Sequence, residues 1–264
     1  YVADTIGIDP VEFRKINALK PGSVTLTGEV ITAHTGDVKK CIEEAAKAIN
    51  YGTKTEEELE REKKTGKIIG KAVCALHKAP AMPPYTGTVV ILKMNEDGSV
   101  IANLSLVDYG AGTYTSIAQM IAEELSLPIE KVKIAFESDT DRDPYDWQTV
   151  ASKGLLLSGN AAILAARDMV DKMYDVASQV LRASKYDLRH KDGKVYVVHR
   201  ENEFLTYQQM SVGYAYPDGK GIGGPIVGVG RYVAQGLTNL DKETGQGNPA
   251  LDWTYGAHGI VLEI

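Results

Sequence analysis

A turn of small residues joins an alternating run to an amphipathic stretch and reads Val107-Asp108-Tyr109-Gly110-Ala111-Gly112-Thr113-Tyr114-Thr115. A second turn of this kind precedes another long helical pattern and reads Thr149-Val150-Ala151-Ser152-Lys153-Gly154. A backbone that turns tightly at the start of a helix leaves N–H groups pointing outward, where they can bind phosphate or another anion. A single Gly-x-Gly turn is ordinary turn chemistry as often as it is a ligand site. Two such turns in one fold predict a bulky, phosphate-bearing cofactor.

Composition restricts the class of protein. The 264 residues are 44% hydrophobic and 24% charged, which is typical of a globular protein with a sizeable core. The net charge of -6 disfavours a general role in nucleic-acid binding. No apolar run approaches the length of a membrane span, and no signal peptide is visible. Cys41 and Cys74 do not form a disulfide framework or a metal-ligand spacing, so we expect them to be small buried residues of a cytoplasmic protein.

The pattern of apolar residues predicts helices first and strands later. Residues 1–65 are expected to be mainly helical, with helices starting at Asp9-Pro10 and at Gly36-Asp37 and a charged helix or connector over 53–64. From about Gly66 the residue pattern is typical of β-strands. Strands are expected over 68–76, 86–94, 99–107, 132–136 and 227–234 and from about 255 to the end. Long helices are expected over 113–125 and 158–183. The sequence therefore predicts an α+β fold of mixed β-sheets with packed helices.

One loop concentrates acidic and aromatic residues. Residues 138–148 contain four aspartates with Tyr145 and Trp147. Three interpretations are open: an oxygen-ligand metal site, a rigid loop that lines a substrate channel, and a series of Asx-turns. We favour the Asx-turns, because the spacing does not match an EF-hand and Pro144 interrupts it. The histidines show no metal-site spacing, and no nucleophile or general base stands out.

Several motifs occur in a fixed order along nearly the whole chain. The first is a helix start with Gly7, Asp9, Pro10, Glu12, Arg14, Asn17 and Leu19. The second is the first turn, followed by Ala118-Gln119 and Ala122-Glu123-Glu124-Leu125. The third runs from Asp139-Thr140-Asp141 through the second turn to Gly159-Asn160-Ala161, and the fourth from Asp241 to Gly247 and Tyr255-Gly256-Ala257. In this order they resemble the molybdopterin-binding large subunit of the xanthine dehydrogenase/aldehyde oxidase family, the molybdenum hydroxylases.

The resemblance implies which residues hold the cofactor. In the family, the two turns bind the pyranopterin and its phosphate or dinucleotide through backbone N–H groups and a serine hydroxyl. The corresponding residues of the first turn are Tyr109, Gly110, Ala111 and Gly112, and those of the second turn are Ala151, Ser152 and Gly154. Ala111 stands where the family usually has glutamine, so one side-chain hydrogen bond is lost. Lys153 and Gly154 also depart from the commoner residues.

The resemblance also implies a domain organisation. Residues 1–65 correspond to the helical end of the first molybdopterin-binding domain and a connector, and residues 66–264 to most of the second. The family's catalytic glutamate is expected beyond Ile264 and its upstream glycine-rich loops before Tyr1. We therefore assign neither a catalytic residue nor a metal ligand to this chain, which we interpret as an internal fragment or a split subunit.

The implied activity is hydroxylation of an aldehyde or an N-heterocycle with oxygen from water. Its cofactor is molybdopterin, in mono- or dinucleotide form, and electrons leave through iron–sulfur clusters and FAD on partner chains or domains. The implied partners are the remainder of the large subunit, the iron–sulfur and flavin subunits and a small-molecule substrate. Without the base, this chain is expected to be inactive alone. The alternative is a non-catalytic structural or assembly segment of a multi-subunit oxidoreductase, in which the turns pack against partner chains.

Overall fold

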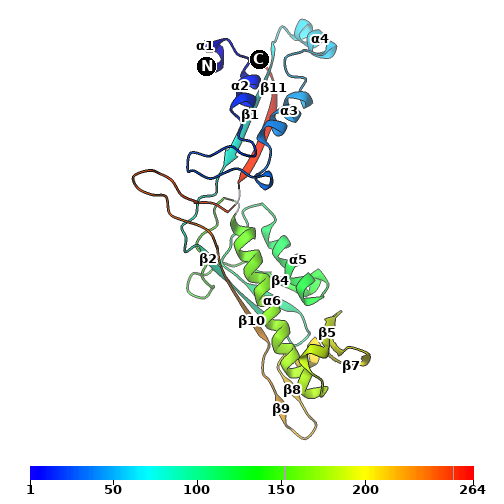
Figure 1. Ribbon diagram of the computed structural model, residues 1–264. Coiled ribbons are helices and arrows are strands. Elements are labelled where there is room, and N and C mark those ends of the chain that lie inside the picture. The colour runs from blue at the N-terminus through cyan, green and yellow to red at the C-terminus, as the bar shows by residue number, and fades with distance from the viewer. Residues whose placement is uncertain (152, 252) are drawn as a thin grey trace. The chain divides into compact units, whose positions relative to one another are not determined.

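The computed structural model describes residues 1–151, 153–251 and 253–264, with the side chain of residue 35 left out. The described chain forms two compact units (Figure 1). Unit 1 comprises Tyr1–Pro84 and Gly236–Ile264, and unit 2 comprises Tyr85–Gln235. Each unit contains both helices and strands, which confirms the predicted α+β class.

Unit 1 is built on a two-stranded antiparallel ribbon with helices packed on it. Strand β1 (Ile69–Lys78) pairs with β11 (Thr254–Glu263) along its whole length. The other elements are α1 (Val2–Ile6), α2 (Pro10–Asn17), the 3-10 turn η1 (Ala33–Thr35), α3 (Val38–Ala48) and α4 (Glu56–Thr65). Helix α3 packs on both strands and α2 packs on α3. Their contact forms a small core of Val11, Val38, Ile42 and Val73.

The helix starts predicted in unit 1 are confirmed by their caps. The Asp9 carboxylate accepts hydrogen bonds from the backbone N–H groups of Val11 and Glu12, and the Asp37 carboxylate accepts one from that of Lys40. These side chains satisfy donors that have no partner inside the helix. Helix α4 buries none of its residues, so the charged segment is indeed a solvated helix.

The expected burial of the cysteines is wrong. Cys74 is exposed and Cys41 is half-buried. Alternate residues of a strand point to opposite faces. Val73 points into the core of unit 1, and its neighbour Cys74 therefore points away from it.

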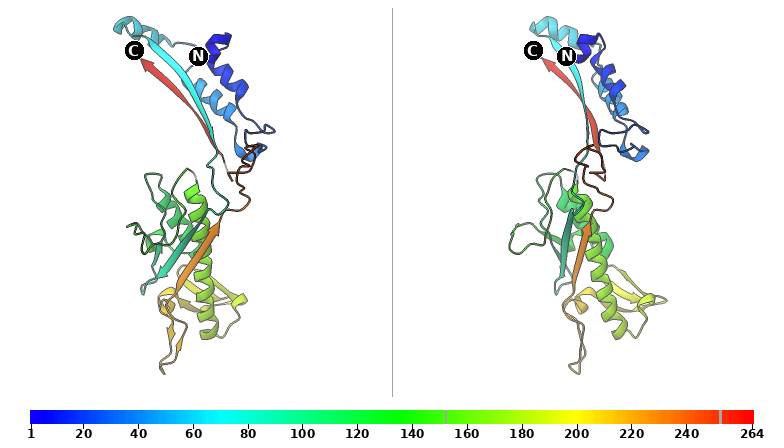
Figure 2. Two further views of the ribbon diagram at one scale, coloured as in Figure 1. Left: turned by 90° about the vertical axis from the view of Figure 1, so that its left-hand side faces the viewer. Right: turned by 60° about the vertical axis from the view of Figure 1, so that its left-hand side comes forward.

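Unit 2 is a four-stranded mixed sheet with two long helices on one face. The sheet has the order β10-β2-β3-β4, in which only β3 and β4 run parallel. Its strands are β2 (Gly87–Met94), β3 (Val100–Asn103), β4 (Val132–Ala135) and β10 (Val227–Val233). Helix α5 (Thr113–Leu125) packs beside β4 and against α6 (Lys153–Val180), which lies along β2 and β10 (Figures 1 and 2). Between sheet and helices lies the main core, which includes Val90, Leu92, Ile117, Ile121 and Ala161.

Two glycines of β10 allow α6 to approach the sheet closely. A Cβ on Gly230 would lie 1.9 Å from the Ala161 carbonyl oxygen, and one on Gly228 would lie 2.1 Å from that of Ala165. No side chain larger than hydrogen fits at either position while the helix stays in place. Helix α6 therefore rests directly on the strand backbone.

The remaining elements of unit 2 lie toward the C-terminal end of α6. They are the turns η2 (Ile129–Lys131) and η3 (Lys185–Asp187), the sheet of β5 (Leu188–Lys191), β6 (Lys194–Val197) and β7 (Arg200–Thr206), the short helix α7 (Tyr207–Met210), and the ribbon of β8 (Tyr214–Ala215) and β9 (Gly221–Ile222). The hairpin predicted around Asp192-Gly193 joins β5 to β6. None of the helices in the described part of the chain has the length and apolar character needed to cross a membrane.

Several boundaries differ from the sequence analysis. Strand β3 ends at Asn103 and not near Val107, so residues 104–107 lie beyond the strand. Helix α6 begins at Lys153 and not near Ser158, so the second turn leads straight into it. The two compact units also divide the chain at residues 84 and 235. That division by contacts is distinct from the assignment of residues 1–65 and 66–264 to two molybdopterin-binding domains, which stays a prediction.

Candidate functional site

A loop segment extends the sheet of unit 2 beyond the end of β3. The Val89 N–H donates to the Tyr145 carbonyl oxygen at 2.9 Å, and the Trp147 N–H donates to the Gly87 carbonyl oxygen at 3.2 Å. Strand β3 pairs with β2 only as far as Asn103, opposite Ile91. Residues 145–147 therefore take the place beside the start of β2 that β3 leaves open.

This extension brings the two predicted turns together. The Val107 N–H, at the start of the first turn, donates to the Thr149 hydroxyl oxygen at the start of the second, at 2.9 Å. Just upstream, the Ser105 hydroxyl donates to the Pro144 carbonyl oxygen. A Cβ on Gly154 would lie 2.8 Å from the Leu106 side chain, so the end of the second turn also lies against the residue that precedes the first. The two turns, about 40 residues apart in the sequence, thus form one surface.

The first turn does not hold its N–H groups free, and this part of the prediction is wrong. The Asp108 carboxylate accepts hydrogen bonds from the backbone N–H groups of Gly110, Gly112 and Tyr114 at 3.0–3.1 Å. The Tyr114 N–H, followed by those of the two glycines, lowers the pKa of the Asp108 carboxyl. An aspartate two residues before a turn is a known Asx-turn signal, and it was available in the sequence. Asp108 thus fixes the shape of the turn from within.

The outer side of the first turn is open. Gly110 and Gly112 have φ angles of +113° and +73°, and a Cβ on either would meet no atom within 4 Å. Such backbone angles favour glycine. Tyr109 is 67% exposed, and Ala111 is exposed as well. The four residues predicted in this turn therefore lie together on an accessible surface.

The second turn has an unusual backbone and an unexpected buried charge. Ala151 has a φ angle of +51°, a strained value for a residue with a side chain. Ser152, one of the predicted contacts, lies outside the described residues. Lys153 is completely buried at the first position of α6, where its ammonium lies 3.9 Å from Asp146 Oδ2. The sequence analysis identified Lys153 only as a departure from the family. Its contact with Asp146 was not predictable, because the two residues are seven positions apart and meet only when the turn folds.

The acidic loop forms the Asx-turns that we favoured. The Asp139 carboxylate accepts from the Asp141 N–H at 2.9 Å, and the Asp143 carboxylate accepts from the Asp139 N–H at 2.7 Å. Among the described residues, no group of three or more histidine, cysteine or acidic side chains is arranged to hold a metal ion. The aspartates therefore shape the loop that leads to the second turn.

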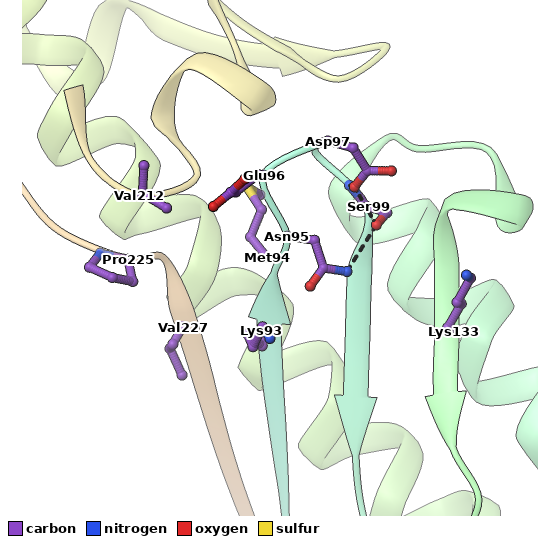
Figure 3. A pocket seen from close by; sticks show the side chains of 10 residues that line it. All are labelled: Lys93, Met94, Asn95, Glu96, Asp97, Ser99, Lys133, Val212, Pro225 and Val227. Atoms are coloured by element: carbon purple, nitrogen blue, oxygen red, sulfur yellow. Dashed lines mark hydrogen bonds between the residues drawn. The ribbon is translucent and has the colours of Figure 1, made fainter. Parts of the chain in front are cut away.

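A separate hollow of about 670 Å³ lies at the hairpin between β2 and β3. Its lining includes Lys93, Asp97 and Lys133, with Val227 on the side of β10 (Figure 3). Strand β3 runs from this hairpin toward the first turn, so the hollow lies at the other end of the strand. It is not part of the surface formed by the two turns.

Comparison with known proteins identifies the family. Residues 44–264 match the family model described as molybdopterin cofactor-binding domain. The chain belongs to this family. The resemblance to the molybdenum hydroxylases of the xanthine dehydrogenase type is thereby confirmed.

Individual relatives agree with this assignment. The chain is 28% identical over 207 residues to the putative xanthine dehydrogenase molybdenum-binding subunit XdhA of Escherichia coli K12, an alignment that covers 77% of this chain and 27% of that protein. It is 30% identical over 120 residues to the carbon monoxide dehydrogenase large chain of Hydrogenophaga pseudoflava, which covers 46% of this chain and 15% of that one. The chain thus spans about a quarter of the length of the XdhA relative.

Solved structures share the fold. Reconstituted CO dehydrogenase from Oligotropha carboxidovorans superimposes with a TM-score of 0.68 at 20% identity, covering 100% of this chain and 33% of that chain. Quinoline 2-oxidoreductase from Pseudomonas putida 86 superimposes with a TM-score of 0.67 at 18% identity, and the match covers 99% of this chain and 33% of that chain. The mixed arrangement of helices and sheets is therefore that of molybdopterin-binding domains.

Proposed function

We propose that the surface formed by the two turns is a molybdopterin cradle of a molybdenum hydroxylase. The proposed contacts are Tyr109, Gly110, Ala111 and Gly112 from the first turn and Ala151, Ser152 and Gly154 from the second. The observation that carries the proposal is the 2.9 Å hydrogen bond from the Val107 N–H to the Thr149 hydroxyl, because it joins the two turns into one surface. Membership of the molybdopterin cofactor-binding family supports the choice of ligand.

The residues of the first turn fit a flat ring better than an anion. The open side of Gly110 and Gly112 allows a ring system to approach the backbone closely, and the exposed Tyr109 can cover it. Asp108 already accepts hydrogen bonds from three N–H groups of this turn, and its charge disfavours a second anion there. We therefore assign the pterin ring to the first turn and the phosphate or dinucleotide to the second, next to the N-terminus of α6.

In this proposal the chain binds and orients the cofactor. When bound, the molybdenum cofactor supplies the redox chemistry for hydroxylating an aldehyde or an N-heterocycle with oxygen from water. Electrons would pass to iron–sulfur clusters and FAD on partner chains or domains. The remainder of the large subunit would complete the substrate site, and we place the assembly in the cytoplasm.

We further propose that this chain does not turn over substrate by itself. The catalytic base that the resemblance implies lies in a Gly-x-Gly-Glu stretch, and this sequence contains none. The chain also spans 27% of the length of its XdhA relative. Detectable hydroxylase activity of the purified chain would contradict this part of the proposal.

Pterin retention tests the cradle. We expect the pterin content of the protein that carries this chain to fall about tenfold when Gly112→Val and Ser152→Ala are combined. A tenfold loss of affinity corresponds to ~1.4 kcal/mol of binding free energy. Valine is strained at the positive φ of Gly112. The matched control is Gly219→Val, at a glycine of the same unit with a φ angle of +86°, whose Cβ would also meet no atom within 4 Å.

The two outcomes separate the two functions. Pterin content is measured by fluorescence after release from the purified protein, together with the melting temperature of each variant. Loss in the double variant and retention in the control support the cradle. Unchanged pterin content in a folded double variant favours the structural or assembly segment.

A further inference from the structure

A buried lysine without a hydrogen-bond partner lies in the second turn, at the first position of α6. The Lys153 side chain is 0% exposed, and within the described part of the chain its Nζ atom has no hydrogen-bond partner. Asp146 Oδ2, 3.9 Å away, is likewise without a partner, on a side chain that is 3% exposed. Nζ also lies over the Trp147 ring, 5.1 Å from its centroid. A buried charge pair and a cation–π contact therefore join the first residue of α6 to residues 146–147.

These contacts join the second turn at Lys153 to the residues that precede it, Asp146 and Trp147. Residues 148–151 lie between Trp147 and Lys153 and include Thr149, which accepts the hydrogen bond from Val107. Because the pair joins both ends of this segment, it limits the positions that the segment can adopt. The strained φ angle of Ala151 lies inside the same closed segment.

Stability alone does not account for the pair. Removing a lysine ammonium and a carboxylate from water costs more than a pair at this distance returns, and apolar replacements of buried pairs are often neutral or stabilising. In agreement, burial lowers the pKa of Lys153, and the Asp146 carboxylate only opposes this effect. Groups held at such a cost are common at functional sites.

We propose that Lys153, Asp146 and Trp147 form a clasp that holds the second turn against the first, so that both face the same ligand. Lys153 is in this view a positioning residue, which acts through Thr149 and Val107 and does not itself touch the cofactor. The proposal rests on the cradle described above for its purpose, but the clasp itself is testable without any cofactor.

The experiment compares three variants by hydrogen exchange and thermal unfolding. Lys153→Met leaves the Asp146 carboxylate buried alone, whereas Lys153→Met combined with Asp146→Leu removes both charges. Lys93→Met is the control, because Lys93 is an exposed lysine in the same unit. The reporter is the exchange rate of the Val107 amide, expressed relative to that of the buried Val195 in β6.

We expect the single variant to unfold at a lower temperature and the double variant to recover most of the loss. In both, the Val107 amide exchanges about five- to tenfold faster than in the unsubstituted protein, as expected when one hydrogen bond is no longer held. The Lys93→Met control leaves this rate unchanged. A double variant that regains its melting temperature while its Val107 amide still exchanges faster indicates that the pair positions the turn and does not merely stabilise the fold.

Two results would overturn the clasp. One is a Val107 amide in the double variant that exchanges as slowly as in the unsubstituted protein. The other is a Lys153→Met variant that matches the Lys93→Met control in both measurements. Pterin retention, measured on the same proteins, tests the cradle separately: an unsubstituted protein that holds no pterin refutes the proposed function and leaves the exchange result to decide on the clasp.

Discussion

Replacement of Gly230 by alanine tests how α6 and the sheet position the two turns. The Cβ of the new residue would lie 1.9 Å from the Ala161 carbonyl oxygen and 2.4 Å from the Ala165 nitrogen. Both are backbone atoms of α6, so no side-chain rotation can relieve the overlap. The helix must therefore move away from β10, and it carries the second turn at its N-terminal end.

The expected cost follows from the size of the overlap. Ordinary contacts of a Cβ begin near 3.4 Å, so the helix must retreat by roughly 1.5 Å. Overpacking of a well-packed core costs typically 1–3 kcal/mol, and the rigid backbone places this variant near ~3 kcal/mol. With a urea slope of about 2.5 kcal/mol per molar, the unfolding midpoint of unit 2 falls by about 1 M.

The assay uses the tryptophans, one in each unit. Trp147 belongs to unit 2 and Trp253 to unit 1. In a Trp253→Phe background, the fluorescence of Trp147 reports on the urea unfolding of unit 2 alone. Gly221→Ala is the control, because a Cβ at that position meets no atom within 4 Å. If Gly230→Ala and Gly221→Ala unfold at the same urea concentration, the close approach of α6 to β10 is refuted.

Three further substitutions test other contacts. Tyr207→Phe removes the buried hydroxyl that donates to the Leu125 carbonyl oxygen at 2.7 Å, and we expect a loss of about 1–2 kcal/mol in the same urea assay. Leu106→Ala opens a cavity beneath the second turn at a cost of about 2–4 kcal/mol, also measured by urea unfolding. Asp97→Asn should lower the melting temperature at pH 7 and have a much smaller effect at pH 2, because hydrogen bonds from the Ser99 side chain and N–H lower the Asp97 pKa from 3.8 to about 2. A carboxyl with a lowered pKa stabilises the fold fully above its unfolded pKa and loses this effect as the pH falls through the folded value. A difference in melting temperature that is as large at pH 2 as at pH 7 would contradict this assignment.

Local features of the fold were readable from the sequence. Asp9-Pro10 and Asp37 marked helix starts that the caps confirm, and the alternating run before Val107 marked a strand, although β3 ends at Asn103. These signals depend on neighbouring residues alone. The family motifs added the identity of the domain, which the comparisons confirm.

Features that depend on contacts between residues far apart in the chain could not be predicted from the sequence. The Val107–Thr149 hydrogen bond and the Lys153–Asp146 pair arise only when residues 144–149 run beside the start of β2 and the residues that follow β3. Asp108 is an instructive case, because its signal was local. The turn looked like an anion site, yet the nearest anion was its own side chain. Glycine-rich turns that begin with aspartate should therefore be checked for an internal acceptor before an anion is assigned to them.

A ligand that covers both turns protects the amides of both from exchange with solvent. This is tested by hydrogen exchange of the protein that carries this chain, with molybdopterin bound and after its removal. We expect the amides of residues 109–112 and 149–154 to exchange more slowly when the cofactor is bound, while those of β5, β6 and β7 do not change. Unchanged exchange in both turns, in protein that demonstrably retains the cofactor, would contradict the proposed cradle.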